Sequence, residues 1–268
     1  MIVSSSAMAA NIAGVATKLK AELPPAYVAA VQAARSLRGN SDFTGATAKL
    51  NAAAITALRE GREPGADPLV QALAAEVTLA AAGLGAAVEQ WVSDHVTERI
   101  NEHADAILTT FAEAVRPDLE VLERAAPQLD QADLNNPDTV ALRRAGLLDV
   151  WALASASAER GDLAISGLRY ILRAVHVGFD GPAGNALLIA PDADVSTITA
   201  IGARSGRGTL SAWTAARCGA PLRLPTVTEY QRAVARFTAA RQERERQADA
   251  EAEQRPKPKQ QQQWTKIR

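Results

Sequence analysis

The chain has 268 residues, a hydrophobic content of 47% and a formal net charge of −1, enough for one large domain or two small ones. The near-neutral charge argues against a wholly basic nucleic-acid binder and against a strongly acidic protein. Only 4% of the residues are aromatic, and much of the hydrophobic fraction is alanine, which is the best helix former but adds little buried area. This composition favours closely packed helices.

The cysteine count, the N-terminal segment and the length of the apolar runs indicate the cellular compartment of the chain. The single cysteine, Cys218, cannot form an internal disulfide, so nothing points to an oxidising compartment. No cation precedes Lys18, which is the wrong order for a secretory signal peptide. The longest strongly apolar run, 77–88, has twelve residues, fewer than the ~20 that a membrane-spanning helix needs. We expect a chain that is cytoplasmic or part of an assembled particle, not secreted through a signal peptide and not membrane-bound.

Three short helices are predicted at the start of the chain, over residues 7–22, 26–37 and 44–61. Proline and glycine residues separate them, and a turn-rich linker over 59–68 follows the third.

A very long helix is predicted next, over about 68–116. Apolar residues recur every three or four positions between Pro68, which suits a first turn, and Pro117, which we expect to end the helix. At 1.5 Å per residue, ~48 residues would extend over ~70 Å. That length indicates a rod, a coiled coil, or a hairpin broken near Gly83 and Gly85. Because both flanks of the two glycines are helical, we interpret them as a kink or a close helix contact, not as a phosphate loop.

A helical hairpin and a small β element are predicted after the long helix. Asn136 and the residues after it open a helix that Gly161 should end, and Asp162 should cap a second helix that closes at Gly178. Residues 186–201 are rich in β-branched and turn residues, which predicts a short β-hairpin.

The C-terminal part is predicted to hold two more helices and a polar tail. A short helix should run from Thr209 to Arg217. Thr226 and Glu229 form a capping box that opens a last helix. This helix should bury an apolar stripe of Tyr230, Val234 and Phe237, which does not continue beyond Ala240.

The expected fold is therefore a mainly α-helical bundle. It has one very long helix (about 68–116), a small β-hairpin element (about 186–201) and an extended polar C-terminal tail. We divide the chain into short N-terminal helices (1–62), the long helix with the helical hairpin (63–179), the β element with the C-terminal helices (180–240), and a charged, Gln-rich tail with a terminal anchor (241–268).

No residue pattern typical of a catalytic or metal centre is found. His95, Glu98, Glu102, His103 and Asp105 lie on the long predicted helix. The order His then Glu is the reverse of that in di-metal bundles, and no second copy occurs. One cysteine cannot build a thiolate zinc cluster. We expect a non-enzymatic protein that holds no cofactor or metal.

Charge is unevenly distributed along the chain. Residues 89–133 contain eleven Asp and Glu against three Arg, a net charge of −8, whereas residues 202–246 contain nine Arg against three Glu, a net charge of +6. Such opposite patches suit head-to-tail association or a charged partner. Arg204 and Arg207 lie on a Gly-rich segment predicted to precede a helix N-terminus, a position that favours anions such as phosphate. An ordinary surface loop that carries two arginines is the alternative.

The last residues combine a tryptophan with an isoleucine and two cations. Trp264 and Ile267 could act as apolar anchors, with Lys266 and Arg268 adding charge, because Trp and Arg often dominate interface energies. A flexible spacer before them would make the segment a docking peptide. A tail that ends in Trp by chance is the alternative.

Taken together, these features predict a structural or assembly protein that acts through helix packing and a C-terminal docking tail. Its partners would be proteins, through self-association or within a larger assembly, and a bacteriophage virion or scaffolding component is one concrete instance. Two alternatives stay open. One is a nucleic-acid-binding accessory protein that uses the Arg-rich region 204–246, and the other is an enzyme of an unrecognised class built around His176 or Cys218.

Overall fold

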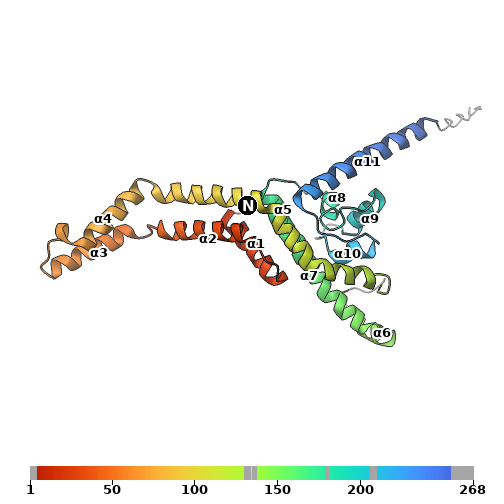
Figure 1. Cartoon of the computed structure of the whole chain (residues 1–268), viewed down its shortest axis with the longest axis horizontal. Helices are drawn as coiled ribbons and strands as arrows, with labels where there is room; N and C mark the ends of the chain where they lie inside the picture. Colours follow the sequence, from red (N-terminus) through yellow and green to blue (C-terminus); the bar gives the residue numbers. More distant parts are fainter. Residues whose placement is uncertain (1–4, 130–133, 135–137, 179–180, 206–209, 255–268) are drawn as a thin grey trace, which may run out of the picture.

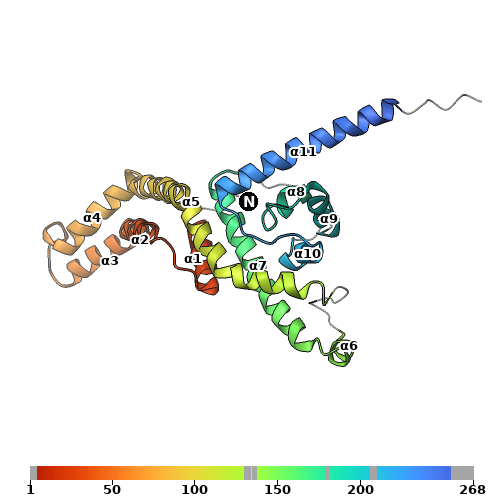
Figure 2. The ribbon, with the colours of Figure 1, turned by 45° about the vertical axis from the view of Figure 1, so that its right-hand side comes forward.

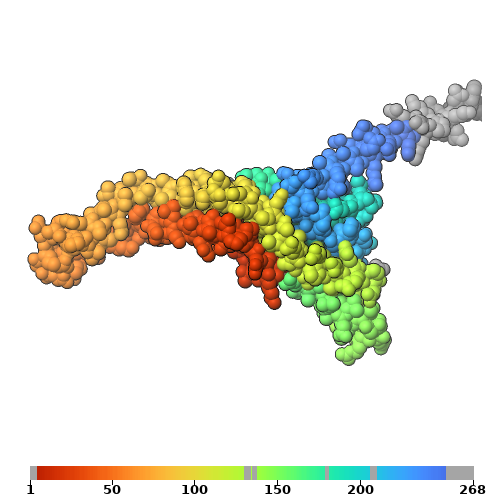
Figure 3. All heavy atoms as spheres, viewed as in Figure 1, coloured from red at the N-terminus to blue at the C-terminus, as the bar shows by residue number. Residues whose placement is uncertain are grey.

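The computed structural model describes residues 5–129, 134, 138–178, 181–205 and 210–254. Figure 1 shows an elongated molecule with an arm on one side, a helical body in the middle and one helix that projects on the other side. The space-filling view in Figure 3 shows the same three parts as one continuous shape. Every regular element in the described ranges is helical.

The first half of the chain forms the arm and one side of the body. Its elements are α1 (Ser5–Leu19), α2 (Pro25–Asn40), α3 (Ala46–Arg59), the 3₁₀ helix η1 (Pro64–Ala66), α4 (Pro68–Ala81) and α5 (Leu84–Ala125). The three short helices predicted at the start are thus confirmed to within a few residues.

The second half of the chain completes the body and adds the projecting helix. Its elements are α6 (Thr139–Arg144), α7 (Leu148–Ala174), α8 (Gly181–Ala186), α9 (Val195–Ser205), α10 (Ala212–Arg217) and α11 (Val227–Gln254). The mainly helical character is confirmed, although several predicted boundaries differ.

The long predicted helix is two helices, α4 and α5, that are bent by 62° at their junction. Gly83 adopts the left-handed conformation there (φ 78°), which a residue with a side chain rarely adopts, and this ends the first helix. The predicted end at Pro117 is wrong, because α5 runs through this proline to Ala125. The apolar stripe continues beyond the proline with Leu119 and Leu122, both buried, and this packing outweighs the cost of an interior proline.

Arg160 of α7 ties three helices together near this proline. Its guanidinium forms an ion pair with Asp118 of α5, with an N–O distance of 2.7 Å. It also donates hydrogen bonds to the carbonyl oxygens of Leu19 at 3.3 Å and Ala114 at 3.2 Å. Ala114 lies three residues before Pro117, in the turn where a proline weakens the helical hydrogen bonds. One side chain thus joins the end of α1 and the interior of α5 to α7.

Helix α7 is continuous through Gly161, so the predicted helical hairpin over 136–178 is wrong. Gly161 serves close packing instead, because a Cβ added there would lie 2.8 Å from Cβ of Ala212 in α10. The carboxylate of Asp162 accepts a hydrogen bond from the backbone N–H of Ala212 at 2.6 Å. The predicted role of Asp162 as the cap of a second helix is therefore wrong, because Asp162 lies inside α7 and holds the first turn of α10 instead. Burial raises the pKa of Asp162, although the hydrogen bond from Ala212 acts in the opposite direction.

The predicted β-hairpin over 186–201 is also wrong. The segment starts at the end of α8, continues through buried turns and enters α9. Asp194 explains the helix, since its carboxylate accepts hydrogen bonds from the N–H groups of Ser196 (2.7 Å) and Thr197 (3.0 Å) and caps the first turn. Ile198, Ile201 and Gly202 are buried at helical spacing. Capping and burial together override the β propensity of the branched residues.

The last helix begins as predicted. The side chain of Glu229 accepts from the N–H of Thr226 at 2.9 Å, and the hydroxyl of Thr226 accepts from the N–H of Glu229 at 3.2 Å. Asp105 of α5 holds the same helix end by accepting from the N–H of Val227 at 2.8 Å. Tyr230 is buried, and α11 then leaves the body, as Figure 2 shows.

Candidate interaction surface

The arm is a jointed pair of antiparallel helical limbs. We call residues 25–59, which comprise α2 and α3, the outgoing limb, and residues 68–98, which comprise α4 and the start of α5, the returning limb. Helix α2 packs on α5 near the body, and α3 packs on α4 at the distal end (Figure 1). Each limb thus has the other limb as its main neighbour over most of its length.

The turn at the arm tip is well ordered by its polar side chains. Asp67 is only 6% exposed and accepts hydrogen bonds from the N–H groups of Leu69 and Val70, which caps α4. Arg62 forms an ion pair with the same carboxylate. The side-chain amide of Gln71 donates to the carbonyl oxygen of Gly65 at 2.8 Å. The tip is therefore a built turn that holds the two limbs in one register.

Large apolar side chains are exposed along the arm. Among the described residues, nine large hydrophobic side chains are exposed, and seven of them lie between residues 37 and 91. They are Leu37, Ile55, Leu58, Leu69, Leu79, Leu84 and Trp91. Leu58 and Leu69, near the tip, are 64% and 61% exposed. Burial within the distal pair is correspondingly sparse, since Leu73 is the one fully buried large apolar residue described in α3 and α4.

Each limb carries an apolar stripe in addition to the residues that face the other limb. On α2, residues recur every three or four positions on one flank, at Ala26, Ala30, Ala33 and Leu37, whereas Tyr27, Val31 and Ala34 are buried toward the core. On the returning limb, Leu84 and Trp91 are seven residues apart and exposed. Helices with two apolar stripes are expected in bundles of more than two helices. Because the arm has only two limbs, the apolar stripe of each limb that does not face the other limb stays exposed to solvent.

Trp91 and His95 extend this exposed stripe toward the body. Their rings are stacked, with centroids 4.7 Å apart and planes 11° from parallel. Trp91 is 50% exposed. A large, half-exposed aromatic side chain held in place by a neighbour is a typical anchor for a protein interface.

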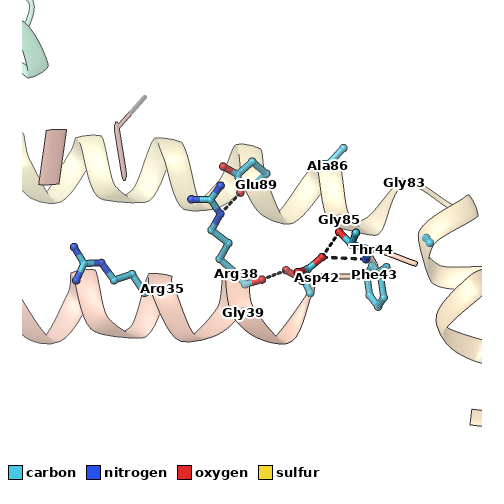
Figure 4. A pocket seen from close by; sticks show the side chains of 12 residues that line it. Arg35, Arg38, Gly39, Asp42, Phe43, Thr44, Gly83, Gly85, Ala86 and Glu89 are labelled. Atoms are coloured by element: carbon cyan, nitrogen blue, oxygen red, sulfur yellow. Dashed lines mark hydrogen bonds and ion pairs between the residues drawn. The ribbon is translucent and has the colours of Figure 1, made fainter. Parts of the chain in front are cut away.

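A groove lies where both limbs bend. It has a volume of about 690 Å³ and lies between the turn from α2 to α3 and the turn from α4 to α5. Figure 4 shows Arg38 reaching across it to Glu89, with an N–O distance of 2.8 Å. The ring of Phe43 lies against Gly85, where an added Cβ would be 3.7 Å from the ring. The ion pair and the ring thus fix the joint between the two limbs.

The predicted anion-binding arginines are only partly described. Arg204 lies in the last turn of α9, not before a helix N-terminus, and its guanidinium donates to the carbonyl oxygen of Arg217 at 3.3 Å. Arg207 lies outside the described residues. Anion binding there stays a prediction. The same holds for the docking tail, since Trp264, Lys266, Ile267 and Arg268 also lie outside the described residues.

Several arginines of the predicted basic region are held by carboxylates of the same chain. Asp192 forms ion pairs with Arg223 at 2.9 Å and with Arg236 at 3.2 Å. Burial would raise the pKa of Asp192, but hydrogen bonds from the two guanidinium groups outweigh burial and lower it. Arg241 and Arg246 form ion pairs with glutamates on α11. Four of the nine arginines of residues 202–246 thus form ion pairs, and the net charge of +6 already includes the three glutamates of this region.

The histidines and the cysteine do not form a cluster. His95 stacks on Trp91, His103 lies edge-on to Tyr27, and His176 is exposed. In the described part of the chain, no group of three or more His, Cys, Asp and Glu residues is arranged to hold a metal ion.

Within the described ranges, no single helix is long and apolar enough to cross a membrane. Helices α4 and α5 meet the length and composition only as a pair, and this pair is bent by 62°.

Comparisons with known proteins find no matching family model, no matching curated protein and no matching solved structure.

Proposed function

We propose that the chain is a non-enzymatic assembly protein that works by burying its arm against helices of a partner. The observation that carries this proposal is the uncovered second stripe on both limbs, with seven large apolar side chains exposed between residues 37 and 91. Apolar surface of this kind stabilises a complex by about 25 cal/mol for each Å² removed from water.

The composition of the returning limb supports the same proposal. From Pro68 to Val88 the chain contains one ionisable side chain, Glu76. Most of these residues are nevertheless exposed. Large contiguous apolar patches are uncommon on monomeric proteins and mark interaction sites. A limb with this composition and exposure is expected to be covered in the working protein.

The C-terminal end supplies a second element of the proposal. Beyond Phe237, the described residues of α11 carry no large apolar residue, and the helix projects from the body (Figure 2). A docking segment of Trp264, Lys266, Ile267 and Arg268 after such a spacer would reach a partner away from the body. A component of a bacteriophage virion or its scaffold is the concrete instance that we propose for this class of protein.

The two alternatives receive less support from the geometry. Nucleic-acid binding through residues 204–246 needs unneutralised arginines, and Arg223, Arg236, Arg241 and Arg246 form ion pairs with carboxylates. Catalysis around His176 or Cys218 needs acidic partners in a shared pocket, whereas His176 is exposed.

The experiment that tests the proposal compares two matched double variants. Leu58→Glu with Leu69→Glu adds two charges to the arm, and Val140→Glu with Leu153→Glu adds two charges at residues that are 59% and 57% exposed outside the arm. We expect the unaltered chain and the second variant to sediment, in an extract of the native cells, in complexes at least twice as heavy as the 28.2 kDa monomer. The arm variant should sediment as the monomer. Co-sedimentation of the arm variant with the unaltered chain would show that the arm is not the interface.

A further inference from the structure

We infer that the partner of the arm is a second copy of this chain, and that the two arms pair in parallel, around a two-fold axis along their length. This inference rests on the proposed function, because it names the occupant of the same surface. The observation that carries it is the opposite charge of the two limbs.

The outgoing limb is basic and the returning limb is acidic. Residues 25–59 contain four Lys and Arg against one Asp, a net charge of +3. Residues 68–98 contain four Asp and Glu and no Lys or Arg, a net charge of −4 with His95 neutral. Most of these charges are exposed, including Arg35, Lys49, Asp94 and Glu98. The ion pair of Arg38 with Glu89 shows the same attraction between the limbs of one arm.

The charges select one of two symmetric ways to place two arms face to face. A two-fold axis along the arm puts the outgoing limb of one copy on the returning limb of the other copy, so opposite charges meet. A two-fold axis across the arm puts each limb on its own counterpart, so like charges meet. Opposite charges across an interface favour the correct partner and orientation, and like charges oppose the wrong one. The two arms are therefore expected to point in the same direction, with their tips together.

This arrangement also satisfies the rules of helix packing. Every helix would have antiparallel neighbours on both sides, as in an up-and-down four-helix bundle. The small side chains of Ala26, Ala30 and Ala33 allow the outgoing limb to approach a facing helix closely. Trp91 and Leu37 would lie between the two copies as anchors.

Other classes of partner fit the charges less well. Nucleic acids and anionic lipid surfaces both attract basic helices. The returning limb carries the larger apolar exposure and a net charge of −4, which opposes both. A second copy matches each limb with its complement and needs no additional component.

The test uses the full chain, purified alone, with Cys218→Ser and one spin label at Glu63→Cys, an exposed position at the arm tip. The expected mass by light scattering is about 56 kDa, twice 28.2 kDa. Parallel arms bring the two labels within roughly 30 Å, because packed helices are 8–10 Å apart. Antiparallel arms separate them by about 45 Å or more, since α2 and α3 contain 16 and 14 residues at 1.5 Å per residue. A dimer with the longer distance would overturn the parallel pairing.

Charge-reversal variants provide a second, independent experiment. Arg35→Glu with Lys49→Glu changes the net charge of the outgoing limb from +3 to −1, so both limbs are acidic. Glu76→Lys with Asp94→Lys and Glu98→Lys changes the net charge of the returning limb from −4 to +2, so both limbs are basic. Each variant alone should stay a monomer at concentrations where the unaltered chain is a dimer, with unchanged helical circular dichroism. An equimolar mixture should restore the dimer, because every limb then meets its opposite. Two variants that dimerise as well alone as when mixed would overturn the inference.

Failure of this inference differs from failure of the proposed function. A purified chain that is monomeric, together with heavy complexes in the cell extract, assigns the arm to a different protein and overturns the self-pairing alone. A monomer in both preparations overturns the self-pairing and the assembly function together.

Discussion

Replacing Gly167 by alanine is expected to lower the free energy of unfolding by about 1–3 kcal/mol, the range found when a well-packed core is overfilled. Gly167 lies in the middle of α7, where α1 and α5 approach closely. A Cβ added there would be 2.7 Å from Cε2 of Phe111 and 2.9 Å from Cγ1 of Val15. Both neighbours are buried core side chains, so neither can move into solvent. The backbones of α1 and α5 would have to shift.

The control for this prediction is Gly14→Ala in α1. No atom lies within 4 Å of a Cβ added at Gly14. There alanine should stabilise the helix by roughly 0.5–1 kcal/mol relative to glycine. Chemical denaturation of the two variants beside the unaltered chain measures both effects. Equal stabilities for Gly167→Ala and Gly14→Ala would contradict the close packing of α1, α5 and α7.

Replacing Arg160 by leucine is expected to cost about 2–4 kcal/mol of unfolding free energy. The substitution removes the ion pair to Asp118, whose side chain is 18% exposed. It also removes hydrogen bonds to the carbonyls of Leu19 and Ala114. A carboxylate that loses its charged partner while largely buried keeps its desolvation cost. The hydroxyl of Ser157 still donates to Asp118 at 3.3 Å and offsets part of this cost. Denaturant unfolding of the purified chain measures the loss.

A double-mutant cycle separates the ion pair from the two carbonyl contacts. Asp118→Asn removes the charge but keeps an acceptor near Arg160. The double variant should lose less unfolding free energy than the sum of the losses of the two single variants, because both substitutions remove the same interaction. Fully additive costs would mean that Arg160 and Asp118 do not stabilise each other.

The sequence alone predicted those helices whose ends carry strong local signals. The three N-terminal helices are separated by proline and glycine, and the capping box of Thr226 and Glu229 was found at its correct position. Tyr230 is buried, as the apolar stripe of the last helix required. In these places local propensity and tertiary packing agree.

Errors arose where a residue serves a distant neighbour. The local pattern predicts a helix end at Gly161, yet this glycine allows Ala212 to approach α7. It predicts a helix end at Pro117 as well, although buried residues on both sides of this proline hold α5 together. The β-branched residues after Asp194 predict a strand, but this aspartate caps a helix. Such long-range contacts do not appear in local patterns.

The sequence is sufficient to predict an apolar stripe on the arm helices, but it is not sufficient to predict that this stripe is exposed. From the sequence, the apolar run over 77–88 indicates only a segment too short to span a membrane. Helical periodicity shows that a helix has an apolar stripe, but it does not show what covers the stripe. Only the three-dimensional structure, in which α3 and α4 have each other as their main neighbours, reveals that Leu58, Leu69 and Leu79 are exposed.

The most direct test that the arm is an interface is amide hydrogen exchange in α3 and α4. It is measured on the assembled chain recovered after sedimentation of the cell extract. A bare two-helix arm with little buried apolar surface should open readily and exchange fast. If a partner covers the arm, exchange over 46–81 should be slow in the assembled chain. It should become fast in the Leu58→Glu, Leu69→Glu variant, while α7 exchanges equally slowly in both. Fast exchange over 46–81 in the assembled, unaltered chain would contradict the arm as its interface.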